Sequence, residues 1–319
     1  MTFDTQHARL HRSLACAAAL ALAASAAAAD DAAAPADDAQ KAWSVTVGGG
    51  ALHQFTTDLD RAGDVSVERG YGVVAAGMGL SPALSLGLRV AWEGAWYDID
   101  PSSVLALGSG SRPWRSIQGV QLGASATWSL SESWSIMGGA FGGAAGESDA
   151  DAGDAMTFGG HLAVAWRASD RLTLGGGVLA SSQIEDDVLV VPLLLVDWRI
   201  TDSLRLTNVA GPEAYPTGAG LELVCDALDG WEFGIGGRWE SRRFRLDDVG
   251  PAPEGVGEDS GLGLWLRAGA RPVRGLRLDL LVGMMVGEEL SLDDRNGNAL
   301  ASDDLDPSPF AALFLGYRF

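Results

Sequence analysis

The chain has 319 residues, of which 42 are acidic and 22 are basic, and its formal net charge is −20 at pH 7. Such an acidic excess argues against nucleic acid as a partner and against docking on an anionic membrane surface. Only one of the two cysteines, Cys225, lies beyond the first 29 residues, which excludes a disulfide framework and a thiolate metal site.

Residues 1–29 are predicted to be a secretory signal peptide. Arg9 and Arg12 precede the apolar run Leu14–Ala26, which is too short to cross a membrane as a helix and ends in small residues suited to cleavage. Cys16 raises a lipoprotein as the alternative. In a lipoprotein signal the apolar run precedes the acylated cysteine, but here most of the run follows Cys16. Cleavage removes one acidic and two basic residues and leaves a formal charge of −21.

Residues 30–42 are mostly alanine, aspartate and proline without a pattern, and they are predicted to be a disordered periplasmic leader. Residues 43–319 hold no run of the ~20 apolar residues that a membrane helix needs. Their apolar residues instead alternate with polar or small ones over strand-length stretches, as in Leu84–Glu93, Val120–Trp128 and Leu276–Met284. This period of two predicts an all-β fold, a transmembrane antiparallel up-and-down β-barrel of the Gram-negative outer-membrane type.

The segments between these stretches are of two kinds. Short turns are predicted at Ser81–Ala83, Ser131–Ser133, Ser169–Arg171, Thr201–Ser203, Leu228–Gly230 and Arg271–Gly275. Long polar loops are predicted at Thr56–Arg69, Asp98–Arg115, Gly146–Asp154, Ser182–Asp187, Gly211–Thr217, Leu246–Ser260 and Gly287–Pro307. Alternating short turns and long loops predict about 14 strands with both ends of the barrel in the periplasm, and 12 or 16 strands remain open.

Aromatic residues support this topology. Eight lie on the apolar parity beside the short turns or the chain end, namely Trp43, Trp128, Trp134, Trp166, Trp198, Trp231, Tyr317 and Phe319, and three lie toward the long loops, namely Trp92, Trp96 and Trp239. Two such girdles mark the two membrane interfaces, where lipid and lipopolysaccharide are the expected partners. The final alternation of Leu313, Leu315, Tyr317 and Phe319 resembles the carboxy-terminal signal that the barrel-assembly machinery reads.

The sequence carries little that indicates catalysis or metal binding. His53 and His161 are the only histidines after residue 29, and neither stands in a serine–histidine or aspartate–histidine motif of the outer-membrane hydrolases. The acidic run from Asp293 to Asn298 looks like a calcium loop, but a register started at Asp294 lacks the required glycine and bidentate glutamate. No catalytic residue, metal or cofactor is therefore assigned.

Charged residues on the inward parity are the candidate lining of a lumen or constriction. Near the periplasmic end they are Arg167, Arg171, Arg199, Arg205, Arg271, Arg277 and Arg318 against Asp197, Asp226, Glu232 and Asp279, and higher up Arg89, Glu93, Glu222, Arg238, Glu240, Arg242 and Arg267. Cross-strand pairs are predicted for Arg205 with Asp226 and for Glu232 with Arg271, while Arg277 and Arg318 have no carboxylate opposite in this register. A salt-bridged filling and an anion-preferring constriction are both open.

One strand breaks the alternation, because Leu189, Val191, Leu193 and Leu195 face inward if Val190 faces lipid. An apolar lumen wall needs a cover, which a plug, an inward-folded loop or a hydrophobic solute would each supply. The runs Val188–Ile200, Gly218–Leu223 and Arg242–Leu246 resemble porin-like outer-membrane barrels grouped as a domain of unknown function. That resemblance implies the same barrel fold over Trp43–Phe319 and brings no substrate or catalytic residue.

These patterns favour a passive channel or transporter for small solutes. The inward apolar residues from Leu189 to Leu195 add hydrophobic or aromatic compounds to the possible solutes. The alternative is a closed structural or adhesive barrel that displays acidic extracellular loops, and an outer-membrane hydrolase comes third. The sequence places the protein in the outer membrane and leaves the solute and the oligomeric state open.

Overall fold

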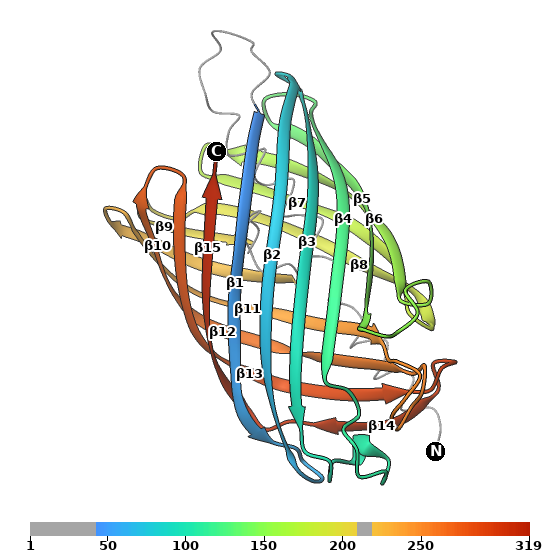
Figure 1. Ribbon diagram of the computed structural model, residues 1–319. Coiled ribbons are helices and arrows are strands. Elements are labelled where there is room, and N and C mark those ends of the chain that lie inside the picture. The colour runs from blue at the N-terminus through green and yellow to red at the C-terminus, as the bar shows by residue number, and fades with distance from the viewer. Residues whose placement is uncertain (1–42, 209–218) are drawn as a thin grey trace.

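The computed structural model describes residues 43–208 and 219–319, and within them almost every element is a strand (Figure 1). The strands are β1 (Trp43–Asp58), β2 (Asp64–Ser81), β3 (Leu84–Ile99), β4 (Ser116–Ser129), β5 (Trp134–Glu147), β6 (Met156–Ser169), β7 (Leu172–Gln183), β8 (Asp186–Arg199), β9 (Leu204–Asn208), β10 (Ala219–Leu228), β11 (Trp231–Arg245), β12 (Val256–Val273), β13 (Leu276–Asp293), β14 (Ala299–Asp304) and β15 (Ser308–Arg318). A 3-10 turn, η2 (Val104–Ala106), lies between β3 and β4. None of the helices described is long and apolar enough to cross a membrane.

The strands close into one barrel. Neighbours in sequence pair antiparallel from β1 to β13, and β15 pairs with both β13 and β1. β14 pairs with the far end of β13, from Glu289 to Asp293, in line with β15, so the two share one place in the wall. The result is the predicted 14-strand barrel with no open edge.

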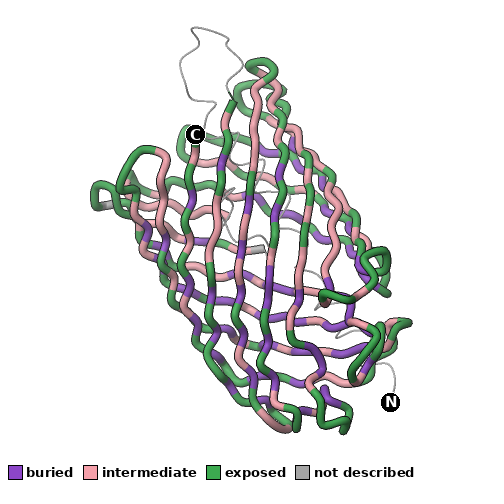
Figure 2. Tube along the Cα trace, in the orientation of Figure 1, coloured by how far each residue is buried: buried purple, intermediate pink, exposed green. Residues whose placement is uncertain are grey.

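The outer face is apolar. Along each strand, exposed large side chains alternate with buried ones, as Figure 2 shows by the change of colour at successive residues. Leu88, Leu122, Leu162, Leu194 and Leu313 all point outward and are more than half exposed. A water-soluble fold would bury such residues, whereas in a membrane barrel they face lipid.

Both predicted aromatic girdles lie on the outer surface. The eight aromatic residues of the short-turn end, Trp43 to Phe319 in the order given above, are exposed, and so are Trp92 and Trp96 toward the long loops, while Trp239 is half-buried. Near the chain end the Phe319 amide donates to the Val45 carbonyl at 2.9 Å, and the Arg318 amide donates to Gly275 in the β12–β13 turn at 2.9 Å. The last residue thus lies beside a short turn, as the topology requires.

Three long loops were predicted too long. The stretches Thr56–Arg69 and Gly287–Pro307 are largely strand, and Leu246–Ser260 is strand from Val256 on, because β1 runs to Asp58, β2 begins at Asp64, β12 begins at Val256 and β13 runs to Asp293. Polarity does not end a strand where backbone pairing continues, and these ladders extend beyond the apolar band. The predicted loop Gly211–Thr217, the signal peptide and the leader lie outside the described residues.

Candidate functional site

The lumen has two unlike walls. Most inward side chains of β5 to β8 are apolar, with His161 and Ser181 the buried polar ones among the described residues, and those of β2, β3 and β10 to β13 carry most of the buried charge. The apolar wall consists of Met137, Ala163, Ala165, Leu179, Leu189, Val191, Leu193 and Leu195, with Phe141 packed against it. The inward orientation predicted for the β8 leucines and Val191 is therefore correct, while Val188 and Val190 on the other face are more than half exposed.

The charged wall begins with a fully buried group on β1, β2, β12, β13 and β15. Arg69 donates to Asp259 at 2.5 Å and to the Gln54 side-chain oxygen at 3.3 Å. The Gln54 amide donates to Glu288 at 2.6 Å and to Ser308 at 2.8 Å. A buried arginine between two carboxylates satisfies charges that would be costly to bury alone.

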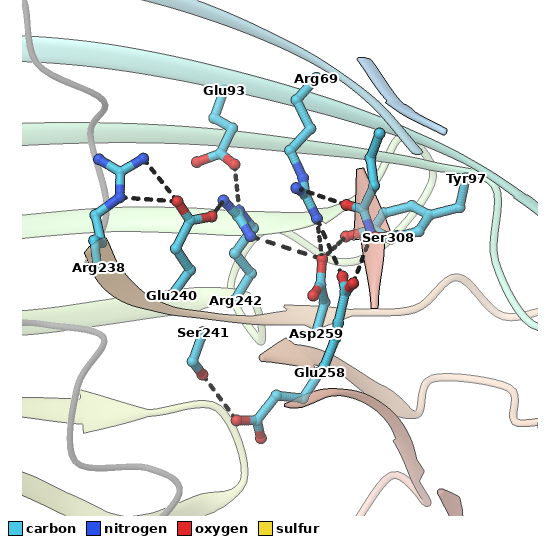
Figure 3. Close-up of polar contacts among 12 residues, drawn as sticks. Arg69, Glu93, Tyr97, Arg238, Glu240, Ser241, Arg242, Glu258, Asp259 and Ser308 are labelled. Atoms are coloured by element: carbon cyan, nitrogen blue, oxygen red, sulfur yellow. Dashed lines mark hydrogen bonds and ion pairs between the residues drawn. The ribbon is translucent and has the colours of Figure 1, made fainter. Parts of the chain in front are cut away.

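This group continues across the lumen (Figure 3). Arg242 on β11 donates to Glu93 on β3 at 2.6 Å and also to Glu240, which accepts from Arg238 at 2.8 Å. The Tyr97 hydroxyl on β3 donates to Asp259 on β12 at 2.8 Å. Because β2, β1, β15, β13 and β12 separate β3 from β11 in the sheet, these contacts bridge opposite sides of the barrel. The lumen is therefore constricted at this level.

A second charged group lies nearer the short turns. Arg267 donates to Glu222 at 2.8 and 2.9 Å and to Asp279 at 2.8 Å. Glu232 pairs with Arg271 at 2.7 Å, as predicted from the register. Arg277 lies opposite Gly316 on β15, so it has no carboxylate directly opposite, as predicted, but it donates to Asp279 on its own strand at 2.6 Å. The two residues are two apart on one strand and thus share a face.

The other sequence-predicted lining residues are scattered. Arg89 is buried on β3, whereas Arg167, Arg199 and Asp226 are exposed near the short turns and Arg318 is half-buried. Arg205 pairs with Asp197 on β8 at 3.4 Å, and this replaces the predicted pair with Asp226. Of the eighteen candidates named from the sequence, the structure joins four in the upper group, Glu93, Arg238, Glu240 and Arg242, and six in the lower group, Glu222, Glu232, Arg267, Arg271, Arg277 and Asp279.

Sequence reasoning missed the fully buried group, namely Gln54, Arg69, Tyr97, Asp259 and Glu288. Three of these five lie in the stretches predicted as loops. The sequence did carry a signal that this stretch is strand and that Arg69 faces inward. Alternate residues Val65, Val67, Arg69 and Tyr71 lie on one face of β2, and all four are buried.

The long-loop end, which is extracellular in barrels of this type, is closed by the tip of β11 and β12. We call residues 243–258, at the turn from β11 to β12, the mouth hairpin. Arg245 pairs with Gly146 of β5, a strand that β6 to β10 separate from β11 in the wall. The hairpin therefore folds inward across the mouth.

One face of the mouth hairpin packs on an apolar cluster. Phe244 is buried against Trp114, with ring centroids 5.4 Å apart, and against Tyr97 at 6.2 Å. Leu246 joins the same cluster, to which β2, β3, β13 and η2 also contribute. Aromatic rings at these separations form favourable contacts in addition to the area they bury.

The other face is held by two arginines. Arg243 donates to the Ile184 carbonyl, between β7 and β8, at 2.6 Å. Arg245 donates to the Asp154 carbonyl, between β5 and β6, at 3.2 Å and to the Glu185 carboxylate at 2.5 Å. Two connections of the opposite wall, β5–β6 and β7–β8, are thereby tied to a single hairpin.

The acidic run after β13 is a capped turn. Asp294 accepts from the backbone amides of Asn296 at 2.8 Å and Asn298 at 2.9 Å, and from the Asn298 side chain at 2.9 Å. The side-chain amide of Asn298, followed by its backbone amide, holds the pKa of Asp294 below its ordinary value. The Asp294 carboxylate thus stabilises the turn itself.

No protein-family model and no curated protein matches the sequence. Solved structures that are similar over most of the chain include an outer membrane channel from Pseudomonas putida F1, at 12% identity over 90% of this chain and 99% of that one, with a TM-score of 0.45. The Pseudomonas putida toluene transporter TodX is 10% identical over 96% of both chains, with a TM-score of 0.45. The KdgM porin is 8% identical over 85% of this chain and 99% of that one, with a TM-score of 0.35. Likenesses at this level assign no solute and no residue role to this chain.

Proposed function

We propose that the protein is an outer-membrane channel for small, largely apolar solutes, closed at its extracellular mouth in this conformation. The observation that carries the proposal is the apolar wall of β5 to β8. Apolar side chains that face water cost about 25 cal/mol per Å², and a barrel that only displays loops can line its lumen with small or polar residues. An apolar wall on four adjacent strands fits a lumen that receives apolar molecules.

The closure of the mouth is compatible with transport. Arg243 and Arg245 hold the mouth hairpin to the opposite wall through the backbone carbonyls of Ile184 and Asp154. Hydrogen bonds of this kind exchange for bonds to water, so the closed form competes with an open one at moderate cost. A covalent or fully apolar plug would not allow this.

The surroundings and assembly follow from the same fold. We infer that outer-membrane lipid and lipopolysaccharide contact the exposed apolar band, after export directed by the signal peptide. The barrel-assembly machinery is the proposed partner of the final strand, whose Leu313, Leu315, Tyr317 and Phe319 all point outward and are exposed.

The second candidate is a closed structural or adhesive barrel. The contacts that bridge the lumen favour it, since Arg242 with Glu93 and Tyr97 with Asp259 brace opposite walls. Such bracing gives rigidity whether or not a solute passes.

Planar-bilayer recording of the purified, refolded protein separates the two. A channel gives discrete current steps, and ethylbenzene added to the chamber should reduce their amplitude as it occupies the apolar wall. A structural barrel gives no steps, either as wild type or after the mouth hairpin is released by Arg243→Ala with Arg245→Ala. Current steps whose amplitude ethylbenzene does not change would support a channel but would contradict apolar solutes as its substrates.

A further inference from the structure

His161 is a buried polar residue among the apolar side chains of this wall, and so is Ser181, whose hydroxyl already donates to backbone carbonyls of Phe158 and Ser182. His161 lies on β6, directly opposite Gly139 on β5 and Leu179 on β7, and its side chain is on the same face as Ala163. A Cβ on Gly139 would lie 2.5 Å from the His161 Cε1 atom and 3.3 Å from Nδ1. The imidazole ring therefore packs closely against the Gly139 backbone, where a larger residue would collide with it.

The ring is buried without a hydrogen bond. His161 is 8% exposed, and in residues 43–208 and 219–319 neither Nδ1 nor Nε2 has a hydrogen-bond partner. A neutral imidazole has one donor and one acceptor, and buried polar side-chain atoms in proteins are rarely left without a bond. The neighbours on this face, Met137, Ala163 and Leu179, offer nothing to either nitrogen.

We propose that His161 and the surrounding apolar wall form a binding site for a small, uncharged apolar molecule that carries one hydroxyl group, of the phenol class. The proposal rests on the proposed function only in that the molecule reaches the wall through the lumen. A hydroxyl both donates and accepts, so it matches either tautomer of the imidazole. A pure hydrocarbon leaves both nitrogens unbonded, and a site with buried polar groups discriminates against such a molecule.

Charge on the molecule is disfavoured by the same surroundings. The apolar wall contains no charged side chain, and the ion pairs of the charged wall are on other strands. Transfer of an ionised carboxylate into such a setting is costly without a paired cation. The site therefore selects a phenol over the corresponding benzoate.

Selective labelling tests the site directly, because His53 and His161 are the only histidines in residues 30–319. The barrel is prepared with [15N]histidine in lipid nanodiscs, and the variant His53→Ala assigns the two side chains. Titration with 4-ethylphenol should shift the His161 ring nitrogens to a saturating value. His53, which is half exposed and 3.7 Å from Glu68, should stay unchanged. His161 signals that remain fixed up to the solubility limit would overturn the proposal.

Two variants separate recognition from packing. His161→Phe keeps a flat ring over Gly139 and removes both nitrogens, whereas His161→Gln keeps one donor and one acceptor. Calorimetric titration, with empty nanodiscs subtracted, should show that His161→Phe binds 4-ethylphenol about threefold to tenfold more weakly, the loss expected for one hydrogen bond. Ethylbenzene should bind wild type and His161→Phe equally, and His161→Gln should retain the preference for the phenol.

The outcomes keep the two proposals apart. Equal affinities of wild type for 4-ethylphenol and ethylbenzene would remove the role of His161 even if current steps are recorded in bilayers. Conversely, saturable shifts of His161 in a barrel that never conducts would leave the binding site standing and refute the channel.

Discussion

Release of the mouth hairpin is the sharpest test of how this barrel opens. The perturbation is Arg243→Ala with Arg245→Ala, which removes the contacts to Ile184, Asp154 and Glu185 on the opposite wall. Both arginines also contact their own hairpin, and Arg243 pairs with Asp293 at 2.9 Å on β13, the strand next to β12; we expect these bonds in both the open and the closed form. Only the contacts across the mouth therefore enter the balance between the two forms.

The magnitude follows from these contacts. A hydrogen bond from a charged donor contributes about 1.5–3 kcal/mol, and the lower figure for the two carbonyl partners gives about 3 kcal/mol. The Glu185 side chain is 38% exposed, so its ion pair with Arg245 adds at most about 1 kcal/mol. A loss of about 3 kcal/mol raises the ratio of open to closed forms about a hundredfold.

Single-channel recording measures this ratio as the frequency of opening events. The control is Arg295→Ala, which removes one positive charge on the same side of the barrel. Arg295 pairs with Glu254 of the mouth hairpin at 3.2 Å, but its side chain is 68% exposed, so this ion pair adds at most about 1 kcal/mol to the closed form. The control should open at most about fivefold more often than wild type, while the double variant opens about a hundred times more often.

A double variant that is correctly assembled and opens no more often than wild type would refute the reasoning. In that case the apolar face, where Phe244 packs on Trp114, holds the hairpin without help from the arginines. An equal rise in the Arg295→Ala control would instead show that loop charge, and not the hairpin contacts, sets the opening frequency.

Four further outcomes are expected. The folded protein should fractionate with outer membranes and migrate faster on SDS gels unheated than boiled, because a closed ladder of strands resists detergent; identical migration would contradict the barrel. Deletion of Phe319 should lower the level of assembled barrel several-fold without changing export, and an unchanged level would mean that the last residue is not an assembly signal. Arg167→Ala with Arg199→Ala should reduce anion preference measured by reversal potential, since both are exposed near the periplasmic mouth, and a cation-selective wild type would contradict it. Arg267→Ala should lower the free energy of unfolding by about 3–5 kcal/mol in a denaturant titration, because it leaves the buried Glu222 carboxylate without its cation, whereas Arg271→Ala, at a 60% exposed position, should cost no more than about 1 kcal/mol.

The side of the barrel wall that a residue faces could be predicted from the sequence, because it depends only on alternation along one strand. The period of two placed Leu88 and Leu122 toward lipid and Leu189 and Leu193 toward the lumen, and the structure agrees. Direct cross-strand neighbours were also accessible, as the Glu232–Arg271 pair shows.

Contacts across the lumen were beyond sequence reasoning for a geometric reason. The pair of Arg69 and Asp259 joins β2 to β12, and no register between neighbouring strands brings these two together. Arg277 and Asp279 were missed for a different reason, since only opposite strands were considered and not the next residue on the same face. The inward fold of the mouth hairpin depends on Phe244 meeting Trp114 from a distant loop, which pairing rules do not contain.

The placement of the charges suggests how far the hairpin can move. At its base, Asp259 is fully buried with Arg69 and Tyr97, and breaking such a pair costs about 3–5 kcal/mol because it leaves a charge buried alone. The contacts of Arg243 and Arg245 at the tip are cheaper to exchange for water. Opening should therefore move residues 243–258 and leave the bridge of Arg242 with Glu93 in place.

If the contact between Arg242 and Glu93 stays in place, it separates two sides of the lumen at its level. On one side lie the charged strands, where Arg242 and Asp259 already have protein partners. On the other side lies the apolar wall of β5 to β8, above which the tip of the mouth hairpin meets Gly146, Asp154 and Ile184. Lifting the tip thus uncovers the mouth above the apolar wall first, so the charged network acts as a fixed frame and the apolar side is the path left for a solute.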